Sequence, residues 1–153
     1  MNTTAAAPPL AAPTSPSAAP FAWPVRVYWE DTDAGGIVFY ANYLKFFERA
    51  RTEWLRALGV EQQALREATG GVFVVSETRL RYHRPSRLDD LLSVTAALVE
   101  AGRASLTIAQ GAWRGGECLC EGTIRIGWVD AATLRPQRLP TAVLQALSPP
   151  DRA

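Results

Sequence analysis

The sequence has little of what several classes of protein need. Its 153 residues include two cysteines and one histidine, and 16 basic side chains almost balance 15 acidic ones, for a formal charge of +1. Proteins that bind nucleic acid normally show a basic excess or stripe, so this balance argues against nucleic acid as the main partner. No stretch reaches the roughly 20 apolar residues that a membrane-spanning helix needs, so no membrane span is predicted.

The two cysteines, Cys118 and Cys120, lie two residues apart in a predicted strand. Residues at that spacing point to one face of a strand, and such a pair is poorly placed to form a disulfide. A C-x-C pair with a single histidine in the chain is also a weak metal signal. The sequence therefore predicts two reduced structural thiols, no metal site and a cytoplasmic location, because reduced thiols are typical of that compartment.

The start of the chain is apolar but does not read as a secretory signal. It carries no basic residue, and its apolar run is interrupted by Pro8, Pro9, Pro13, Pro16 and Pro20. A secretory signal needs a basic start and an unbroken apolar run, whereas an Ala/Pro-rich segment with little to bury stays disordered. We therefore expect a disordered tail over residues 1–21, one domain over residues 22–148 and a short C-terminal tail over residues 149–153.

The first half of the domain predicts one strand and two helices. Alternating residues predict a strand over residues 23–29, and a polar, glycine-bearing loop follows over residues 30–36. Apolar residues then recur at three- and four-residue steps from Tyr43 to Leu58, which predicts a long amphipathic helix that Gly59 ends. A shorter helix is expected over residues 61–68.

The second half predicts four strands, over residues 72–82, 91–100, 104–113 and 118–129, and a last helix over residues 141–147. Strict alternation places Val74 on the same face as Leu80 and Tyr82. A helix with one apolar stripe and an antiparallel sheet can bury each other only face to face. We therefore expect an α+β domain in which a five-stranded antiparallel sheet wraps around the long helix, with the last four strands in a meander and an edge that a second copy covers.

One segment combines features that acyl transfer requires. Asp31 and Asp33 lie in the loop ahead of the long helix, and Gly35 and Gly36 follow them. The first amides of a helix have no intrahelical acceptor and favour negative charge, so a carboxylate beside them suits acyl transfer. Glycine also lets a ligand approach the backbone. On spacing alone, two aspartates that merely cap the turn remain the alternative.

The block W-E-D-T-D-A-G-G-I-V-F-Y-A-N-Y-L at residues 29–44, followed by F-E-R-A-R-T-E-W-L at residues 47–55, resembles the signature of hot-dog-fold acyl-CoA thioesterases. The nearest branches are the Tol-Pal-associated acyl-CoA thioesterases and the 4-hydroxybenzoyl-CoA thioesterases. The resemblance runs from about residue 23 to about residue 141. It implies a hot-dog fold, hydrolysis of acyl-CoA to a carboxylic acid and coenzyme A, no cofactor, and a homodimer or homotetramer.

The resemblance also implies roles for individual residues. Asp33 is the expected catalytic residue, as nucleophile or as general base on water, and the backbone N–H of Tyr40 is expected to donate to the thioester carbonyl. Tol-Pal-associated members usually carry histidine where this chain has Tyr40, which leaves the substrate and a histidine-assisted mechanism open. Asp31 is assigned to shaping the loop. The residues expected to bind substrate are Gly36, Ile37, Tyr43 and, at the coenzyme A phosphates, Arg103. Tyr43 fits a core position on the helix equally well.

Two other functions stay open at this stage. The same fold serves acyl hydratases and dehydratases, whose sites normally pair a histidine with an acidic residue in the loop–helix region. Here the only histidine, His83, follows another strand and is expected at the surface or an interface. The other alternative is a non-catalytic module that binds acyl-CoA or acyl carrier protein.

Overall fold

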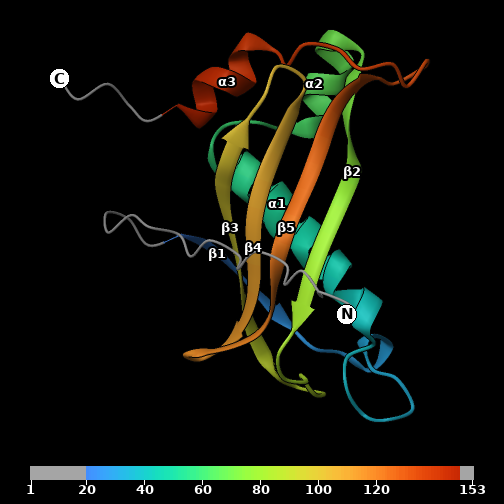
Figure 1. Ribbon diagram of the computed structural model, residues 1–153, viewed down its shortest axis with the longest axis vertical. Helices are drawn as coiled ribbons and strands as arrows, with labels where there is room; N and C mark the ends of the chain where they lie inside the picture. The colour runs from blue at the N-terminus through green and yellow to red at the C-terminus, as the bar shows by residue number, and fades with distance from the viewer. Residues whose placement is uncertain (1–19, 149–153) are drawn as a thin grey trace, which may run out of the picture.

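The computed structural model describes residues 20–148 and forms a five-stranded antiparallel sheet wrapped around one long helix (Figure 1). The strands are β1 (Phe21–Arg26), β2 (Gly71–Tyr82), β3 (Leu91–Ala101), β4 (Ser105–Arg114) and β5 (Glu117–Asp130). The helices are α1 (Tyr43–Ala57), α2 (Gln62–Thr69) and α3 (Thr141–Leu147), with short 3-10 turns η1 (Trp29–Asp31) and η2 (Tyr40–Asn42) before α1. The expected α+β, hot-dog arrangement is confirmed.

The structure describes the chain from Pro20 to Ser148. The tails expected over residues 1–21 and 149–153 lie outside the described residues, apart from Pro20 and Phe21. Phe21 is the first residue of β1 and pairs with Ala96 of β3. No helix within residues 20–148 is long and apolar enough to cross a membrane.

The strand order is β1-β3-β4-β5-β2, which differs from the expected meander of the last four strands. Only β3, β4 and β5 follow one another as neighbours, while β2 pairs with β5 at the far edge. The reason lies in α1, which connects β1 at one edge to β2 at the other. The helix therefore crosses the concave face of the whole sheet, as Figure 1 shows.

The apolar stripe of α1 forms the centre of the core. Its buried residues include Tyr43, Phe46, Phe47, Ala50 and Leu55, while Lys45, Glu48 and Arg49 on the other faces are exposed. The facing strands contribute buried side chains such as Val94, Ile108 and Ile124. Removing a large apolar side chain from water contributes about 1.5–3 kcal/mol, so this stripe supplies much of the stability of the fold.

Buried hydrogen bonds fix the position of α1 on the sheet. The Arg51 guanidinium donates to Gln110 Oε1 at 3.0 Å, and the Gln110 amide donates to the Phe47 carbonyl at 2.9 Å. Burial lowers the pKa of Arg51. Because hydrophobic burial is non-directional whereas hydrogen bonds have defined geometry, these bonds set where along β4 the helix sits.

A β-bulge in β2 reverses the alternation that the sequence predicted. Val75 and Thr78, three residues apart, lie opposite two buried isoleucines of β5, and the register shifts between Val75 and Glu77. Residues directly opposite on paired strands share a face, so Val75 and Thr78 both face the helix side. The prediction that Val74 shares a face with Leu80 and Tyr82 is therefore wrong, because one extra residue shifts the alternation.

A second bulge separates the two cysteines. Ala112 of β4 lies opposite Cys120, and the next residue, Trp113, lies opposite Cys118. Consecutive residues point to opposite faces, so the two cysteines do as well. Cys120 is fully buried in the core, whereas Cys118 is half-buried on the outer face. The prediction that they share a face is wrong because Leu119 is the extra residue, but the predicted free thiols are confirmed.

Candidate active site

The segment between β1 and α1 folds into a hairpin that its first aspartate holds together. Asp31 is only 4% exposed, and its carboxylate accepts a hydrogen bond from the Tyr28 N–H at 2.8 Å. Its carbonyl oxygen accepts bonds from the Phe39 N–H and from the Asn42 side-chain amide, each at 2.9 Å. Asp31 therefore ties the start of the hairpin to its return arm and to the approach to α1.

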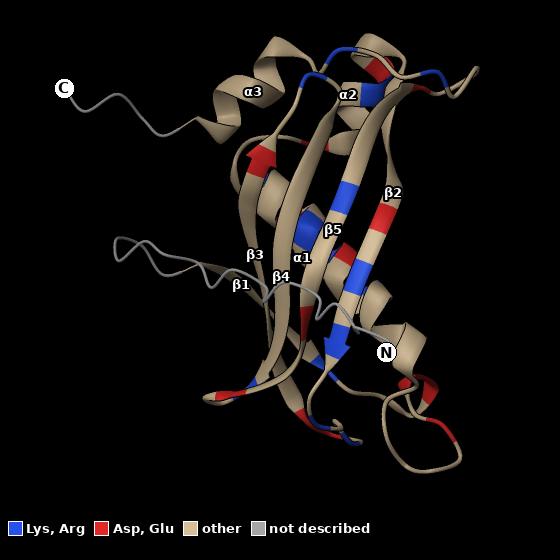
Figure 2. Cartoon of the chain, in the orientation of Figure 1, with Lys and Arg blue, Asp and Glu red and all other residues tan. Residues whose placement is uncertain are grey.

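Asp33 lies at the turn of the same hairpin, where Figure 2 shows acidic residues in red. Its N–H donates to the Ile37 carbonyl at 2.9 Å, next to the bridge between Thr32 and Val38. Its exposed carboxylate accepts a bond from the Gly35 N–H at 2.8 Å through Oδ1. Among the residues that the structure describes, nothing else donates to this carboxylate, so Oδ2 is available to a ligand.

Gly36 and Ile37 complete the turn. Gly36 has a φ of +77°, in the left-handed region that favours glycine, and its N–H donates to the Asp33 carbonyl at 3.0 Å. A side chain at this position would meet no atom within 4 Å, so the backbone here is open to a ligand. Ile37 is half-buried and forms a bridge with Arg87 of the segment between β2 and β3.

Tyr40 begins η2 at the end of the return arm of the hairpin. Within residues 20–148, no hydrogen-bond acceptor is found for its N–H, as expected for the first amide of a helical turn. Its carbonyl oxygen accepts a bond from the Tyr82 hydroxyl at 2.8 Å, so β2 holds this peptide in place. The Tyr40 side chain is 64% exposed. An available N–H thus lies in the same loop as the available carboxylate oxygen of Asp33.

Tyr43 is buried rather than open to the loop surface. It is 3% exposed, and its hydroxyl bonds the Ser86 hydroxyl at 2.7 Å. Burial raises the pKa of Tyr43, so its hydroxyl stays neutral. The Ser86 carbonyl also accepts the Val38 N–H at 2.9 Å. In the single chain Tyr43 is therefore a core residue that is linked to the hairpin through Ser86. This is the core position that the helix pattern allowed.

Arg103 lies far from these groups in the single chain. It belongs to the turn between β3 and β4, at the top of Figure 1, whereas the hairpin is at the bottom. Its side chain is exposed, and its carbonyl oxygen accepts the Leu139 N–H at 2.8 Å. The fold of one chain thus does not bring Arg103 to Asp33.

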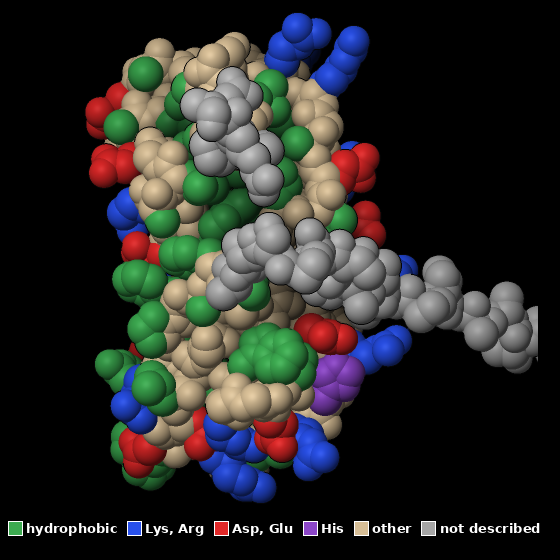
Figure 3. Space-filling model, turned by 90° about the vertical axis from the view of Figure 1, so that its left-hand side faces the viewer, with side chains coloured by type: hydrophobic (Ala, Val, Ile, Leu, Met, Phe, Trp, Pro, Cys, Tyr) green, Lys and Arg blue, Asp and Glu red, His purple; other side chains and the backbone are tan. Residues whose placement is uncertain are grey.

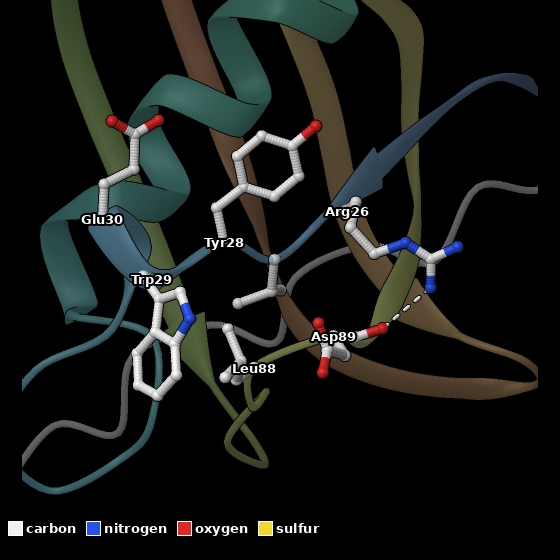
Figure 4. Close-up of a pocket in the computed structure, with 7 residues that line it drawn as sticks. Arg26, Tyr28, Trp29, Glu30, Leu88 and Asp89 are labelled. Atoms are coloured by element: carbon white, nitrogen blue, oxygen red, sulfur yellow. Dashed lines mark hydrogen bonds between the residues drawn. The ribbon is translucent and has the colours of Figure 1, made fainter.

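A shallow groove of about 340 Å³ lies beside the hairpin (Figure 4). Its lining residues are Arg26, Val27, Tyr28, Trp29, Glu30, Leu88 and Asp89. Trp29 is 80% exposed, and the Arg26 guanidinium donates to the Asp89 carbonyl at 2.8 Å across the groove. Neither Asp33 nor Tyr40 lines it. This groove therefore cannot hold an acyl group against Asp33.

Two supporting residues, Tyr82 and Ser86, were not among the site residues that the sequence predicted. Tyr82 ends β2 and Ser86 follows Pro85, more than 40 positions from the residues they bond. No local pattern predicts these two contacts, because only the return of β2 past the hairpin brings the residues there. A tyrosine at the end of a predicted strand, followed by a polar loop, is the one signal that the sequence offers.

Comparison with known proteins agrees with this arrangement. Residues 35–121 match the Thioesterase superfamily. The chain belongs to this family. Acyl-CoA thioesterase YbgC of Haemophilus influenzae is 43% identical over 126 residues, which cover 82% of this chain and 93% of that protein. Acyl-CoA thioester hydrolase YbgC of Escherichia coli O157:H7 is 41% identical over 125 residues, which cover 81% and 92%.

A solved structure also resembles this thioesterase in fold and sequence. A probable thioesterase from Bartonella henselae has a TM-score of 0.75 and 31% identity, covering 80% of this chain and 100% of that one. The resemblance to acyl-CoA thioesterases that residues 29–55 indicated is therefore confirmed. The roles of Asp33, Gly36, Ile37, Tyr40, Tyr43 and Arg103 remain predictions.

Proposed function

We propose that this protein hydrolyses acyl-coenzyme A thioesters and that Asp33 is its catalytic carboxylate. The observation that carries the proposal is the hairpin itself. It presents one available carboxylate oxygen of Asp33 and one available backbone N–H at Tyr40 in the same loop. The identity of 43% to an acyl-CoA thioesterase supports the choice of substrate class.

The reaction needs two contributions from these groups. Water, or the Asp33 carboxylate itself, adds to the thioester carbonyl carbon, and the C–S bond then breaks to release the thiol of coenzyme A. If Asp33 acts as a general base it takes the proton of the attacking water, and if it acts as nucleophile water hydrolyses the resulting anhydride. In both routes the Tyr40 N–H stabilises the oxyanion, a contribution of about 3 kcal/mol for one good donor.

The single chain leaves this site unfinished, and we infer that a second copy completes it. The edge strand β2 exposes Val74 and Val75 to 38% and 54%, and a free edge normally needs cover. Exposed aromatic side chains also surround the hairpin, with Trp29 at 80% and Tyr40 at 64%. A homodimer that pairs through β2 would enclose the acyl group and bring distant groups such as Arg103 of one copy toward the other.

The alternative functions find less support. A hydratase would pair a histidine with the hairpin, but the only histidine, His83, lies 3.4 Å from Glu121 of β5. A non-catalytic module would not need an available carboxylate and an available N–H in the same loop. Acyl carrier protein carries the same thioester as coenzyme A and stays an alternative donor of the acyl group. We also infer a cytoplasmic location, since Cys118 and Cys120 are both free thiols.

The central test compares the two aspartates of the hairpin. Asparagine keeps the shape of aspartate but is neither a base nor a useful nucleophile, so Asp33→Asn should lower kcat at least about 100-fold with little change in KM. Asp31→Asn should reduce kcat less, because an amide oxygen can still accept the Tyr28 N–H. Thiol release from a panel of short, long, hydroxylated and aromatic acyl-CoAs measures both.

The outcomes of this comparison separate the family assignment from the residue assignment. A larger loss in Asp31→Asn than in Asp33→Asn would show that the catalytic residue is misassigned. Equal, wild-type rates in both variants would place the chemistry elsewhere. An absence of thiol release by the wild type, with acyl-CoA still bound, would favour the binding module.

A second prediction separates the Tyr40 backbone from its side chain. Tyr40→Phe keeps the N–H and the bond from Tyr82 to the carbonyl, so most of the rate should remain. A fall of about 100-fold, the size expected for losing one oxyanion donor, would instead show that the hydroxyl does the work of the histidine found in related enzymes. Steady-state kinetics at saturating acyl-CoA measures the difference.

A third prediction concerns the β2 edge. Light scattering at micromolar concentration should give at least a dimer mass, and Val74→Lys, which places a charge on that edge, should shift the mass toward the monomer and reduce thiol release with it. Val99→Lys is the matched control, because Val99 is 59% exposed but lies on β3, away from the β2 edge. A fully active wild-type monomer would contradict the account.

A further inference from the structure

Three side chains with metal-binding atoms meet on the outer face of the sheet, outside the hairpin. His83 directly follows β2, and Cys118 and Glu121 belong to β5. His83 Nε2 lies 3.4 Å from Glu121 Oε1, and Cys118 Sγ lies 3.6 Å from Glu121 Oε2. The three ligand atoms all lie within 4.8 Å of one another. Figure 3 shows the histidine, in purple, at the surface beside acidic side chains.

The bulge at Leu119 creates this arrangement. Regular alternation would place Cys118 on the helix side with Cys120, but the extra residue moves it to the outer face with Glu121. The same bulge anchors the histidine, because the Leu119 carbonyl accepts the His83 N–H at 2.8 Å and the Arg84 N–H at 3.2 Å. The backbone therefore brings the three residues next to one another.

The separations between the three side chains are close to those that a tetrahedral site requires. Zinc binds nitrogen and carboxylate oxygen at about 2.0–2.2 Å and sulfur at about 2.3 Å, so neighbouring ligands in a tetrahedron lie about 3.3 Å apart for N···O and about 3.6 Å apart for S···O. The observed 3.4 Å from His83 and 3.6 Å from Cys118 are of this size, but they run to different oxygens of Glu121, Oε1 and Oε2, so the carboxylate must turn to present one oxygen to the ion. Rotation of these side chains could thus bring the three donors around one cation.

We propose that His83, Cys118 and Glu121 form a binding site for Zn²⁺, with a fourth position open to water. One nitrogen, one sulfur and one oxygen donor suit zinc, whereas magnesium and calcium take oxygen ligands. The side chains of His83 and Glu121 are 36% and 41% exposed, which gives the ion a way in. The adjacent Arg84 forms an ion pair with Glu117 at 3.5 Å. This pairing reduces the repulsion between Arg84 and a bound cation.

A reactive thiol is the competing interpretation of Cys118. Burial, together with the Glu121 carboxylate, raises the pKa of Cys118 to about 11. The thiol is therefore neutral at pH 7, which is the opposite of what a nucleophilic cysteine needs. A zinc ion supplies the positive charge that converts such a thiol into a thiolate ligand.

The position of the site gives the ion a structural role. The segment that begins at His83 carries Ser86, whose two oxygens hold Val38 of the hairpin and Tyr43 of α1. Zinc would pin the start of this segment to β5 and so stabilise the support of the hairpin. No residue of the hairpin is a ligand, so the ion takes no part in thioester hydrolysis. The sequence predicted no metal because it could not place His83 beside Cys118.

Titration of the metal-free, full-length protein with Co²⁺ and then Zn²⁺ tests the proposal. Each chain should bind one Co²⁺ ion and show a thiolate-to-cobalt charge-transfer band. Zn²⁺ should then displace Co²⁺, and the band should disappear. Cys118→Ser should abolish the band, and His83→Gln and Glu121→Gln should each weaken zinc binding at least about tenfold, since even residues that only support a ligand cost about 10–100-fold. Zinc should also raise the melting temperature of the wild type but not of Cys118→Ser.

Cys120→Ala is the matched control, because Cys120 is two residues away but buried on the other face. It should keep the charge-transfer band. A wild type without the band, or a band that survives in Cys118→Ser, would overturn the proposal. His83→Gln carries the test if Cys118→Ser fails to fold, because the His83 side chain is partly exposed, and unchanged zinc affinity in that variant would also overturn it.

Discussion

The arrangement of the sheet depends on the burial of the apolar stripe of α1. Phe46, Phe47 and Ala50 are fully buried, and no single strand could cover them, so the sheet must curve around α1. β1 and β2 lie at opposite edges of the sheet, and α1 connects them across its concave face. The first turn of α1 therefore lies close to the end of β1. The hairpin of Asp31 and Asp33 is the connection that this geometry imposes between β1 and α1. The candidate site is thus a consequence of how the core is covered.

Within the hairpin, the two aspartates have opposite environments. Asp31 is buried and accepts backbone N–H bonds from Tyr28 before the hairpin and from Phe39 on its return arm, which ties the two arms together. Asp33 is exposed and shares one oxygen with the Gly35 N–H, which orients its carboxylate and leaves the other oxygen for chemistry. Rigid support beneath an available group is the arrangement that preorganised catalysis needs. Tyr82 and Ser86 extend that support from β2 and the segment after it.

Local patterns in the sequence were sufficient for most elements. The stripe from Tyr43 to Leu58 predicted α1, and the helix expected over residues 141–147 is α3. Alternation failed where one residue was added, at the bulges in β2 and β5, because periodicity has no signal for an insertion.

Long-range placement was also beyond the sequence. The order that puts β2 beside β5, the bond from Tyr82 to Tyr40 and the meeting of His83 with Cys118 all depend on how distant segments pack. The hairpin was found because its residues are contiguous and resemble a known family. Its supports were missed because they lie more than 40 positions away.

The most direct measurement is a crystal structure of the Asp33→Asn variant with an intact acyl-CoA bound. The account predicts that the thioester carbonyl oxygen lies about 2.7–3.1 Å from the Tyr40 nitrogen, with the side chain at position 33 facing the carbonyl carbon or a water beside it. A thioester bound away from the hairpin, or a carbonyl oxygen held by other donors, would contradict the account.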